Sequence, residues 1–401
     1  MQPRQAARGR KEASDAGSAP AAAEEEAGNA LAGPAADPTP GDWAAARASV
    51  VKRARKAGRA GAELVVAVCG AKGLGKSTFL RSVGQAVAGL CAEVWYLDTD
   101  LGQPERGVPG LVSLRRWGAE EPEHALFVGD NTPAAHPVSY LDACRELVRR
   151  HRCGAGAPDR AGVLLVNTHG WNIGLGAELV AAVCAAAGVH LLAHLRHASR
   201  PDGIAPAQMG AQLERTLALT GVVLGASYSP EEERFLRFAR YFGARSLAVL
   251  EARAPLRVPV AALALLASVD AAADARPDPP APADLVGSYA ALCRRAPGGV
   301  LDFVALAIVR AAEPAPEPGW LLVLPPALAP ELERLHERAD ALVLGSQPFQ
   351  LLRWQDNDSN ALAAQGHKPF VAFAHQCVHL ADEARANRKN LKRRRLLRRP
   401  T

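Results

Sequence analysis

Apolar runs that read as strands alternate with helix-like segments over most of this chain. ELVVAVCG at 63–70 is continuously apolar and ends in glycine, and the next segment, 77–90, has its apolar residues at helical spacing. The alternation then repeats along the chain. The predicted strands are 63–70, 92–100, 162–170, 190–196, 221–226 and 246–252, and the predicted helices are 77–90, 138–152, 175–188 and 229–243. Strands apolar on both faces that alternate with helices predict an α/β fold with a doubly wound parallel sheet.

Composition shifts divide the chain further. Residues 1–58 are rich in Ala, Gly, Pro and Glu with few large apolar side chains, and we expect a disordered tail there. A second low-complexity stretch, DAAADARPDPPAPAD at 270–284, predicts a linker or long loop. Strand-like runs at 300–312, 319–326 and 339–352 indicate a smaller β-rich unit. The predicted organisation is a tail at 1–58, an α/β domain at 59–255, a linker or helical connection at 256–299, a β-rich domain at 300–380 and a basic tail at 381–401.

Composition excludes several protein classes. The chain has 401 residues, 49% of them hydrophobic and 22% charged, which fits a globular protein. No apolar run approaches the ~18 residues that a bilayer span needs, so we expect no membrane-spanning segment. The seven cysteines include no Cys-x-x-Cys pair, which argues against a disulfide scaffold or zinc ribbon and favours a reducing compartment.

Positive charge is unevenly placed. Residues 385–401 hold nine basic side chains and no acid, so the remaining chain has 38 basic against 41 acidic residues, about −3. Of 47 basic residues only eight are lysines, and none lies between Lys76 and Lys368. A lysine in the folded body is therefore informative, and Lys72 and Lys76 stand four residues apart in one glycine-rich loop.

That loop is the strongest motif in the sequence. GAKGLGKS at 70–77 satisfies G-x-x-x-x-G-K-[ST] and stands between a predicted strand and a predicted helix. Glycines let backbone N–H groups point at phosphate oxygens, beside the positive end of the helix. We expect Lys76 to reach the β- and γ-phosphates of ATP and the Ser77 hydroxyl to ligate Mg²⁺. The predicted ATP-binding residues are Gly70, Ala71, Lys72, Gly73, Leu74, Gly75, Lys76, Ser77 and Thr78, with Lys72 equally compatible with an ordinary surface lysine.

Two carboxylates end the next predicted strand. Asp98 and Asp100 in VWYLDTDLGQPE are two residues apart and would project from the same face of an extended strand. One of them is expected to hold Mg²⁺ through water while the other accepts a proton from an incoming hydroxyl. The alternative is a pair of solvated carboxylates in a turn.

Four motifs in this order resemble the polynucleotide 5′-hydroxyl kinase family. They are the glycine loop, LDTDLGQPE at 97–105 followed by Pro109-Gly110, VNTHGWNIGLGAELV at 166–180 and SPEEERFLRFARYFG at 229–243. The family includes kinases of mRNA 3′-end and tRNA processing and a nucleolar, nucleolar-protein-9-like branch of pre-rRNA processing. ALAIVRA at 305–311 and the VLPP strand are similar to the C-terminal unit of that branch. The resemblance implies a P-loop NTPase fold with a smaller β-rich C-terminal unit, over roughly 61–350.

The resemblance also implies roles for individual residues. Asp100 falls on the family's general base for the RNA 5′-OH, which leaves Asp98 for the metal. Arg234 falls on a lid arginine that faces the transferring phosphate, so the implied catalytic residues are Asp100, Lys76 and Arg234. Gln103, Thr168, Gly170 and Trp171 fall on the RNA-binding segments, where the Trp171 ring offers a stacking face for any base. The alternatives without a functional role are an ordinary packed indole at Trp171 and a solvated helix face at Arg234.

Departures and leftover features qualify this resemblance. The aromatic-Thr-Pro-Pro-Gly stretch of the family is here 106–110, RGVPG, and residues 1–60 offer no counterpart of its folded N-terminal β-domain. The alternation of His375, Cys377 and His379 offers three metal-ligand types but no fourth nearby. The basic cluster at 392–399 has three interpretations: a nuclear or nucleolar localisation signal, an RNA-contacting tail or a merely solvated tail.

The sequence as a whole predicts an ATP- and Mg²⁺-dependent RNA 5′-hydroxyl kinase. By resemblance it would act on RNA 5′-OH ends in pre-rRNA processing, in the nucleus and nucleolus, beside processing proteins such as a nuclease. A nucleotide-bound adaptor that has lost phosphoryl transfer is the alternative. A small-molecule nucleoside kinase would share the glycine loop but explains neither Trp171 nor the basic tail.

Overall fold

The structure of the chain is a computed structural model. It describes residues 40–154, 161–200, 202–223, 230–243, 253, 255–266, 268–270, 288–313, 319–326, 328 and 338–345. The cluster at 375–379, the predicted strand at 246–252 and the basic tail lie outside the described residues. No helix in the described ranges combines the length and the hydropathy that a membrane crossing requires.

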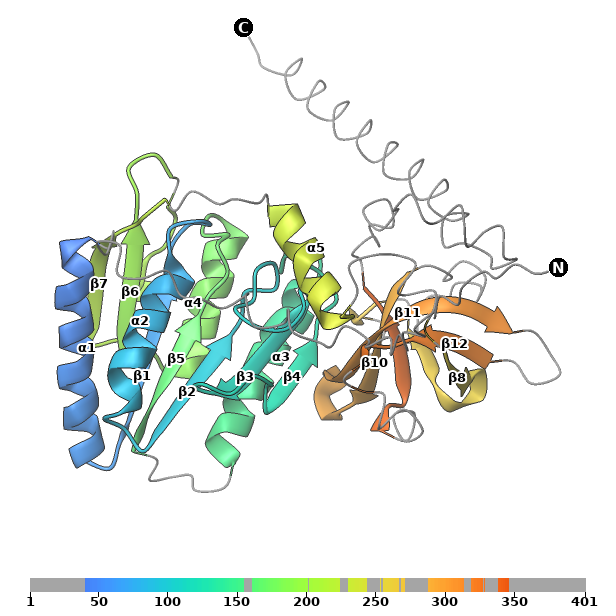
Figure 1. Cartoon of the computed structure of the whole chain (residues 1–401). Helices are drawn as coiled ribbons and strands as arrows, with labels where there is room; N and C mark the ends of the chain where they lie inside the picture. Colours follow the sequence, from blue (N-terminus) through green and yellow to red (C-terminus); the bar gives the residue numbers. More distant parts are fainter. Residues whose placement is uncertain are drawn as a thin grey trace, which may run out of the picture. The chain divides into compact units, whose positions relative to one another are not determined.

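The helices and strands of the first part largely follow the predicted alternation (Figure 1). The helices are α1 (Gly41–Arg59), α2 (Lys76–Ala88), α3 (Pro137–Cys153), α4 (Leu175–Ala187) and α5 (Pro230–Tyr241). The strands are β1 (Glu63–Cys69), β2 (Glu93–Asp98), β3 (Leu111–Arg116), β4 (His124–Phe127), β5 (Gly162–Asn167), β6 (Leu191–Arg196) and β7 (Arg215–Thr220). Short 3₁₀ turns lie at Pro206–Gln208, Val260–Ala262 and Pro297–Gly299.

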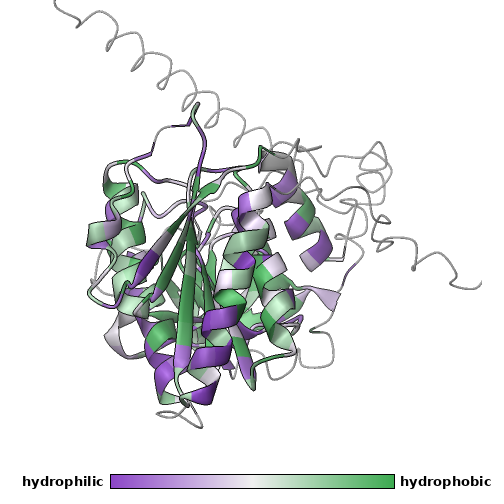
Figure 2. Cartoon of the chain, turned by 90° about the vertical axis from the view of Figure 1, so that its left-hand side faces the viewer, coloured by the Kyte–Doolittle hydropathy of each residue, from purple (hydrophilic) through white to green (hydrophobic). Residues whose placement is uncertain are grey.

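The sheet confirms the predicted P-loop-type α/β fold. Strands pair in the order β7-β6-β1-β5-β2, all in parallel, and β3 and β4 then add in antiparallel fashion. The glycine loop follows β1 and the two carboxylates follow β2, while β5 lies between these strands. The carboxyl ends of all three strands therefore meet at one edge of the sheet, which is where parallel α/β sheets bind ligands. Figure 2 shows apolar strands between helices that carry both polar and apolar residues.

Further strands continue beyond β4. They are β8 (Leu256–Pro259), β9 (Ala264–Leu266), β10 (Tyr289–Arg295), β11 (Leu301–Glu313), β12 (Gly319–Val323) and β13 (Ala341–Leu344). A single residue pair, Leu126 with Asp302, joins β4 to β11. The Arg150 side chain on α3 also binds the Asp302 carboxylate. The β-rich character predicted for this part is thus present, while the predicted domain boundaries remain a prediction.

Helix α1 corrects the prediction of a disordered tail for residues 41–58, while residues 1–39 of that predicted tail lie outside the described residues. Trp43, Ala46, Val50 and Ala54 are buried against the sheet and α2, although three of these four residues are small. Hydropathy alone missed the helix because alanines carry little weight, yet at spacings of three and four they let α1 approach closely. The Trp43 ring meets Phe79 edge to face at 5.4 Å, and its Nε1 donates to Thr220 O at 2.8 Å.

Three other parts of the strand prediction were wrong. The strand expected at 221–226 lies earlier, as β7, where it pairs with β6 through Arg215–Thr220. Strands β3 and β4 were not predicted, because they are only six and four residues long and neither has a long apolar run. Within the connection predicted at 256–299, the structure has β8, β9 and β10. Strands β8 and β9 pair with the distant strands β12 and β13, and β10 pairs with the next strand, β11, and with β13.

The packing of Trp43 predicts a large effect on stability. Trp43→Ala removes a fully packed indole and its hydrogen bond, and should lower the free energy of unfolding by about 3 to 5 kcal/mol in urea titrations. Ala45→Ser, at an exposed position of the same helix, is the control and should change it by less than about 0.5 kcal/mol. Equal stability of Trp43→Ala and the wild type would contradict the docking of α1.

Candidate active site

The glycine loop has the geometry that a phosphate cradle needs. Gly70, Gly73 and Gly75 have φ of 136°, 77° and 85°, values that side chains rarely permit. A Cβ on Gly70 would lie 2.3 Å from Leu195 O, and one on Gly75 would lie 2.9 Å from the Trp43 ring. The loop is therefore held between β6 and α1, and α2 begins directly after it at Lys76.

The two loop lysines differ in environment. Lys76 is 7% exposed and its Nζ donates to Ala71 O at 3.3 Å. Burial lowers the pKa of Lys76, and the negative charge of Asp100 opposes that shift most strongly. Lys72 is exposed; partial burial and then the charge of Arg234 lower its pKa. Lys76 is thus a buried lysine of the loop, while Lys72 is an exposed one.

Asp98 is the most constrained acid of the site. Its side chain is 2% exposed and accepts three hydrogen bonds, from the backbone N–H groups of Asp100 (3.2 Å) and Glu105 (2.6 Å) and from Asn167 Nδ2 (3.0 Å). Burial raises the pKa of Asp98 to about 7, against the lowering effect of these donors. Near neutral pH this carboxyl is therefore poised between its two protonation states.

Asp100 is bound through one oxygen only. Asp100 Oδ1 accepts from the backbone N–H groups of Gly102 and Gln103, both at 3.1 Å. No donor of the described residues lies on Oδ2. Asp100 acts electrostatically on both loop lysines. The two carboxylates are thus distinct, one fully engaged and one with an available oxygen beside the phosphate loop.

The segment after β5 packs directly on the loop. Thr168 is buried, and its hydroxyl donates to Val68 O at 2.8 Å, which ties β5 to the end of β1. A Cβ on Gly170 would lie 2.8 Å from both the N and Cα of Lys72. Gly170 is therefore required for the close approach of this segment to the glycine loop.

Trp171 is anchored at the start of α4. The half-buried indole packs beside the main core, and a Cβ on Gly176 would lie 2.4 Å from its ring. One face of the ring therefore lies on the first turn of α4. The packed-indole interpretation holds for that face, and a role in stacking stays a prediction.

His169 is a residue that the sequence reasoning missed. It is 3% exposed, its ring lies 5.6 Å from Tyr140 and 6.5 Å from Trp171, and its Nδ1 accepts the Trp171 N–H at 3.3 Å. Its Nε2 is buried with no hydrogen-bond partner among the described residues. Burial lowers the pKa of His169 to about 4, so the ring is neutral near pH 7. Its position between two recognised residues, Thr168 and Gly170, was the one available signal.

Helix α5 brings arginines to this edge. Arg237 donates to Glu105 O at 3.2 Å, and Asp98 and Asp100 both act on its charge. Arg234 is close enough to lower the pKa of Lys72. The C-terminal end of α5 is held by aromatic packing, because Phe238 and Phe242, the residue after the helix, stack on Tyr289 with ring centroids 4.6 and 5.9 Å away.

The remaining predicted residues take ordinary positions. Leu74 is buried in the core below the loop. Ser77 and Thr78 are half-buried in the first turn of α2, and Gln103 is half-buried in the turn after Asp100. The structure thus brings the predicted residues of the glycine loop, the carboxylates and the 168–171 segment to one sheet edge, with α5 beside them.

The donor set fits Mg²⁺. Mg²⁺ is usually held by one or two carboxylates together with waters and substrate phosphates rather than by a cage of protein ligands. The Ser77 hydroxyl and the two strand-end carboxylates lie at the loop, and the described residues contain no group of three or more metal-ligating side chains. Because both Asp98 oxygens accept protein N–H groups, this acid suits contact through water.

Comparison with known proteins agrees with this geometry. Residues 70–244 match the model of the mRNA cleavage and polyadenylation factor CLP1 P-loop. This part of the chain is similar to that P-loop domain. The chain is also similar to polynucleotide 5′-hydroxyl-kinase NOL9 of Arabidopsis thaliana (34% identity, 29% of this chain) and of Danio rerio (30%, 29%), and to polynucleotide 5′-hydroxyl-kinase GRC3 of Candida glabrata (30%, 29%). The predicted resemblance to the polynucleotide 5′-hydroxyl kinases is confirmed.

These matches cover limited parts of the relatives. They span 36% of the Arabidopsis thaliana protein, 21% of the Candida glabrata protein and 17% of the Danio rerio protein. Two structures of Clp1p with Pcf11p resemble the fold, with TM-scores of 0.53 and 0.54 at 14% and 15% identity. Each comparison covers 76% of this chain and 79% of the other.

The contact between Gly170 and the loop predicts a defect in nucleotide binding. Gly170→Ala should push the backbone at Lys72 and weaken ATP binding in calorimetric titrations by about tenfold, an effect of about 1.4 kcal/mol. Gly58→Ala, where a Cβ meets nothing within 4 Å, is the control and should bind ATP like the wild type. Wild-type affinity in Gly170→Ala would contradict the close packing.

The low pKa of His169 predicts a pH dependence of stability. The unfolded chain takes up this proton near pH 6.5 and the folded chain only near pH 4, so stability is present above pH 6.5 and lost as the pH falls. His169→Asn removes the proton site. Relative to this variant, the wild type should lose up to about 3 kcal/mol between pH 7 and pH 4 in urea titrations. A difference in free energy of unfolding between the two proteins that does not change with pH would contradict the burial of His169. Asp98 contributes with the opposite sign, but it is present in both proteins and cancels in the comparison.

Proposed function

We propose that the protein is an ATP-dependent polynucleotide 5′-hydroxyl kinase that transfers the γ-phosphate of ATP to the 5′-OH of RNA. The observation that carries the proposal is the division between the two strand-end acids. Asp98 is fully engaged in holding its loop, whereas Asp100 keeps one oxygen available beside Lys76. A proton acceptor next to a phosphate cradle is the arrangement that phosphoryl transfer to a hydroxyl needs.

In this proposal Asp100 Oδ2 accepts the proton of the 5′-OH while the oxygen of this hydroxyl attacks the γ-phosphorus in line. The bond to the β–γ bridging oxygen breaks, and ADP leaves with the electron pair. Lys76 and Arg234 stabilise the negative charge on the transferred group, and the loop N–H groups bind the phosphates. Mg²⁺, held by Ser77 and through water by Asp98, would neutralise phosphate charge when bound.

The acceptor strand would end on the segment after β5. Thr168 and Gly170 fix the position of this segment against the loop, and Trp171 and Gln103 are the proposed contacts of the terminal nucleotide.

We further propose a role in pre-rRNA processing in the nucleolus, with a processing protein such as a nuclease as partner. The similarity to the NOL9 and GRC3 kinases supports this assignment. A nucleotide-bound adaptor without transfer is the alternative, and the Clp1p structures, which contain Pcf11p, are examples of this fold in a complex.

The test is transfer of label from γ-labelled ATP to a 5′-OH RNA oligonucleotide. A kinase yields an RNA with a labelled 5′ end and leaves a 5′-phosphorylated RNA unlabelled. Binding of ATP without any labelled RNA would support the adaptor. Efficient labelling of a free nucleoside would point to a small-molecule kinase instead.

Asp100→Asn tests the base. The amide keeps the shape and the Oδ1 contacts but cannot accept the proton, so turnover should fall by about 10² to 10⁴ while ATP affinity changes little. Rapid-quench measurement of transfer at saturating ATP and RNA separates the two effects. Full activity of Asp100→Asn would reject the assignment.

A further inference from the structure

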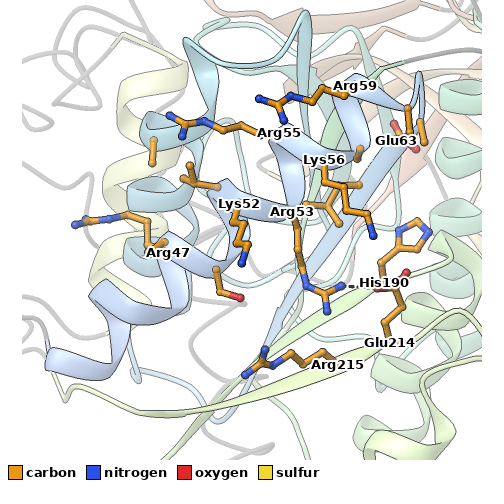
Figure 3. Close-up of a pocket in the computed structure, with 18 of the residues that line it drawn as sticks. Arg47, Lys52, Arg53, Arg55, Lys56, Arg59, Glu63, His190, Glu214 and Arg215 are labelled. Carbon is orange, nitrogen blue, oxygen red and sulfur yellow. Dashed lines mark hydrogen bonds and ion pairs between the residues drawn. The ribbon is translucent and has the colours of Figure 1, made fainter.

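A basic groove lies on the outer side of α1, away from the glycine loop. Side chains of α1, the first residues of β1 and β7 and the end of the turn before β6 line it (Figure 3). Its cations are Arg47, Lys52, Arg53, Arg55, Lys56, Arg59 and Arg215. On α1, residues 52, 55, 56 and 59 stand three and four positions apart and so share one exposed face.

The groove is strongly positive compared with the rest of the chain. Seven cations face two carboxylates, Glu63 and Glu214, a local balance of +5. Both carboxylates are engaged, Glu63 with His151 at 2.6 Å and Glu214 with Arg53. Among the described residues the other six cations have no ion-pair partner. Without this groove and residues 385–401, the chain has 31 basic and 39 acidic residues, a net of −8.

Lysine placement is a second, independent observation. The described residues contain four lysines, Lys52, Lys56, Lys72 and Lys76. Two stand in the glycine loop and two in this groove, and every other lysine or arginine position of the described residues is an arginine. Lysine and arginine together suit phosphate groups, lysine as a mobile point charge and arginine as a planar fork.

The shape and chemistry of the groove favour a nucleic-acid backbone. Trp43 packs on Gly75 of the glycine loop, and the first cation of the groove, Arg47, lies one turn further along α1. From Arg47 to Arg59 the helix rises by about 18 Å, so the cations form a line rather than a point. The lining contains no Phe, Tyr or Trp, which leaves phosphates rather than bases as the groups it can bind.

We propose that this groove binds the phosphate backbone of the acceptor polynucleotide at nucleotides beyond its 5′ end. The inference rests on the proposed function for the identity of the acceptor. The groove adds affinity that depends on length and salt but not on sequence or sugar, while the terminal nucleotide is bound at the sheet edge. Short acceptors do not reach it.

The test replaces the exposed face with neutral side chains of similar length, in Lys52→Gln, Arg55→Gln, Lys56→Gln and Arg59→Gln combined. Binding is measured by anisotropy with a 5′-phosphorylated RNA of about 30 nucleotides, longer than a single-strand site, so the readout needs no transfer. Loss of four contacts should reduce the salt slope by about 2.8 for a single strand. The wild-type affinity should then fall about fifty-fold more than that of the variant between 50 and 200 mM salt.

Arg145→Gln with Arg149→Gln, exposed arginines of α3, is the control and should bind like the wild type. Transfer to a short 5′-OH oligonucleotide should be unchanged in the groove variant, with the KM for long RNA raised. Unchanged affinity and salt slope of the variant for long RNA would overturn the proposal. A variant that binds long RNA like the wild type but no longer binds an acidic peptide would also overturn it. If neither the wild type nor the groove variant transfers phosphate, but the salt slope of the variant is still smaller as expected, the groove proposal is supported and the kinase assignment fails. Thermal melting confirms that the variant is folded.

Discussion

The site depends on the burial of the Asp98 carboxylate at the end of β2. Three donors converge on it, two of them backbone N–H groups from the turn that follows and one from Asn167 on β5. This folds residues 99–105 back on the sheet edge and directs Asp100 toward the phosphate loop. The cost is a desolvated acid whose pKa rises to about 7. A surface aspartate would titrate normally but would not hold the turn.

The same turn connects the sheet edge to α5. Glu105, whose N–H is bound by Asp98, offers its carbonyl oxygen to Arg237, and Arg234 lies one turn away near Lys72. The aromatic side of α5 is stacked on Tyr289 of the β-rich part. The positions of Arg234 and Arg237 are therefore set both by the turn that Asp98 holds and by the packing of α5 on Tyr289.

Much of this arrangement could be predicted from sequence because its signals are local. A glycine loop between a strand and a helix, and acids at a strand end, carry their chemistry within a few residues. The rest required tertiary information. Helix α1 was missed because Ala46 and Ala54 are too small to register as apolar, although close packing is what they permit. His169 was missed because its neutral, buried state depends on neighbours from three elements, and the α1 groove because its cations fell in a segment interpreted as disordered.

The most direct measurement of this account is amide hydrogen exchange in Asp98→Asn. The asparagine side chain keeps one acceptor oxygen. When this oxygen takes the Oδ1 position, facing the Asp100 N–H and Asn167 Nδ2, the NH₂ group takes the Oδ2 position and faces the Glu105 N–H. The account predicts that protection is lost at the Glu105 amide, with faster exchange in α5, while the core amides of β1 and β5 keep theirs. Unchanged protection over 100–105 would show that Asp98 does not hold the turn, and would contradict the account.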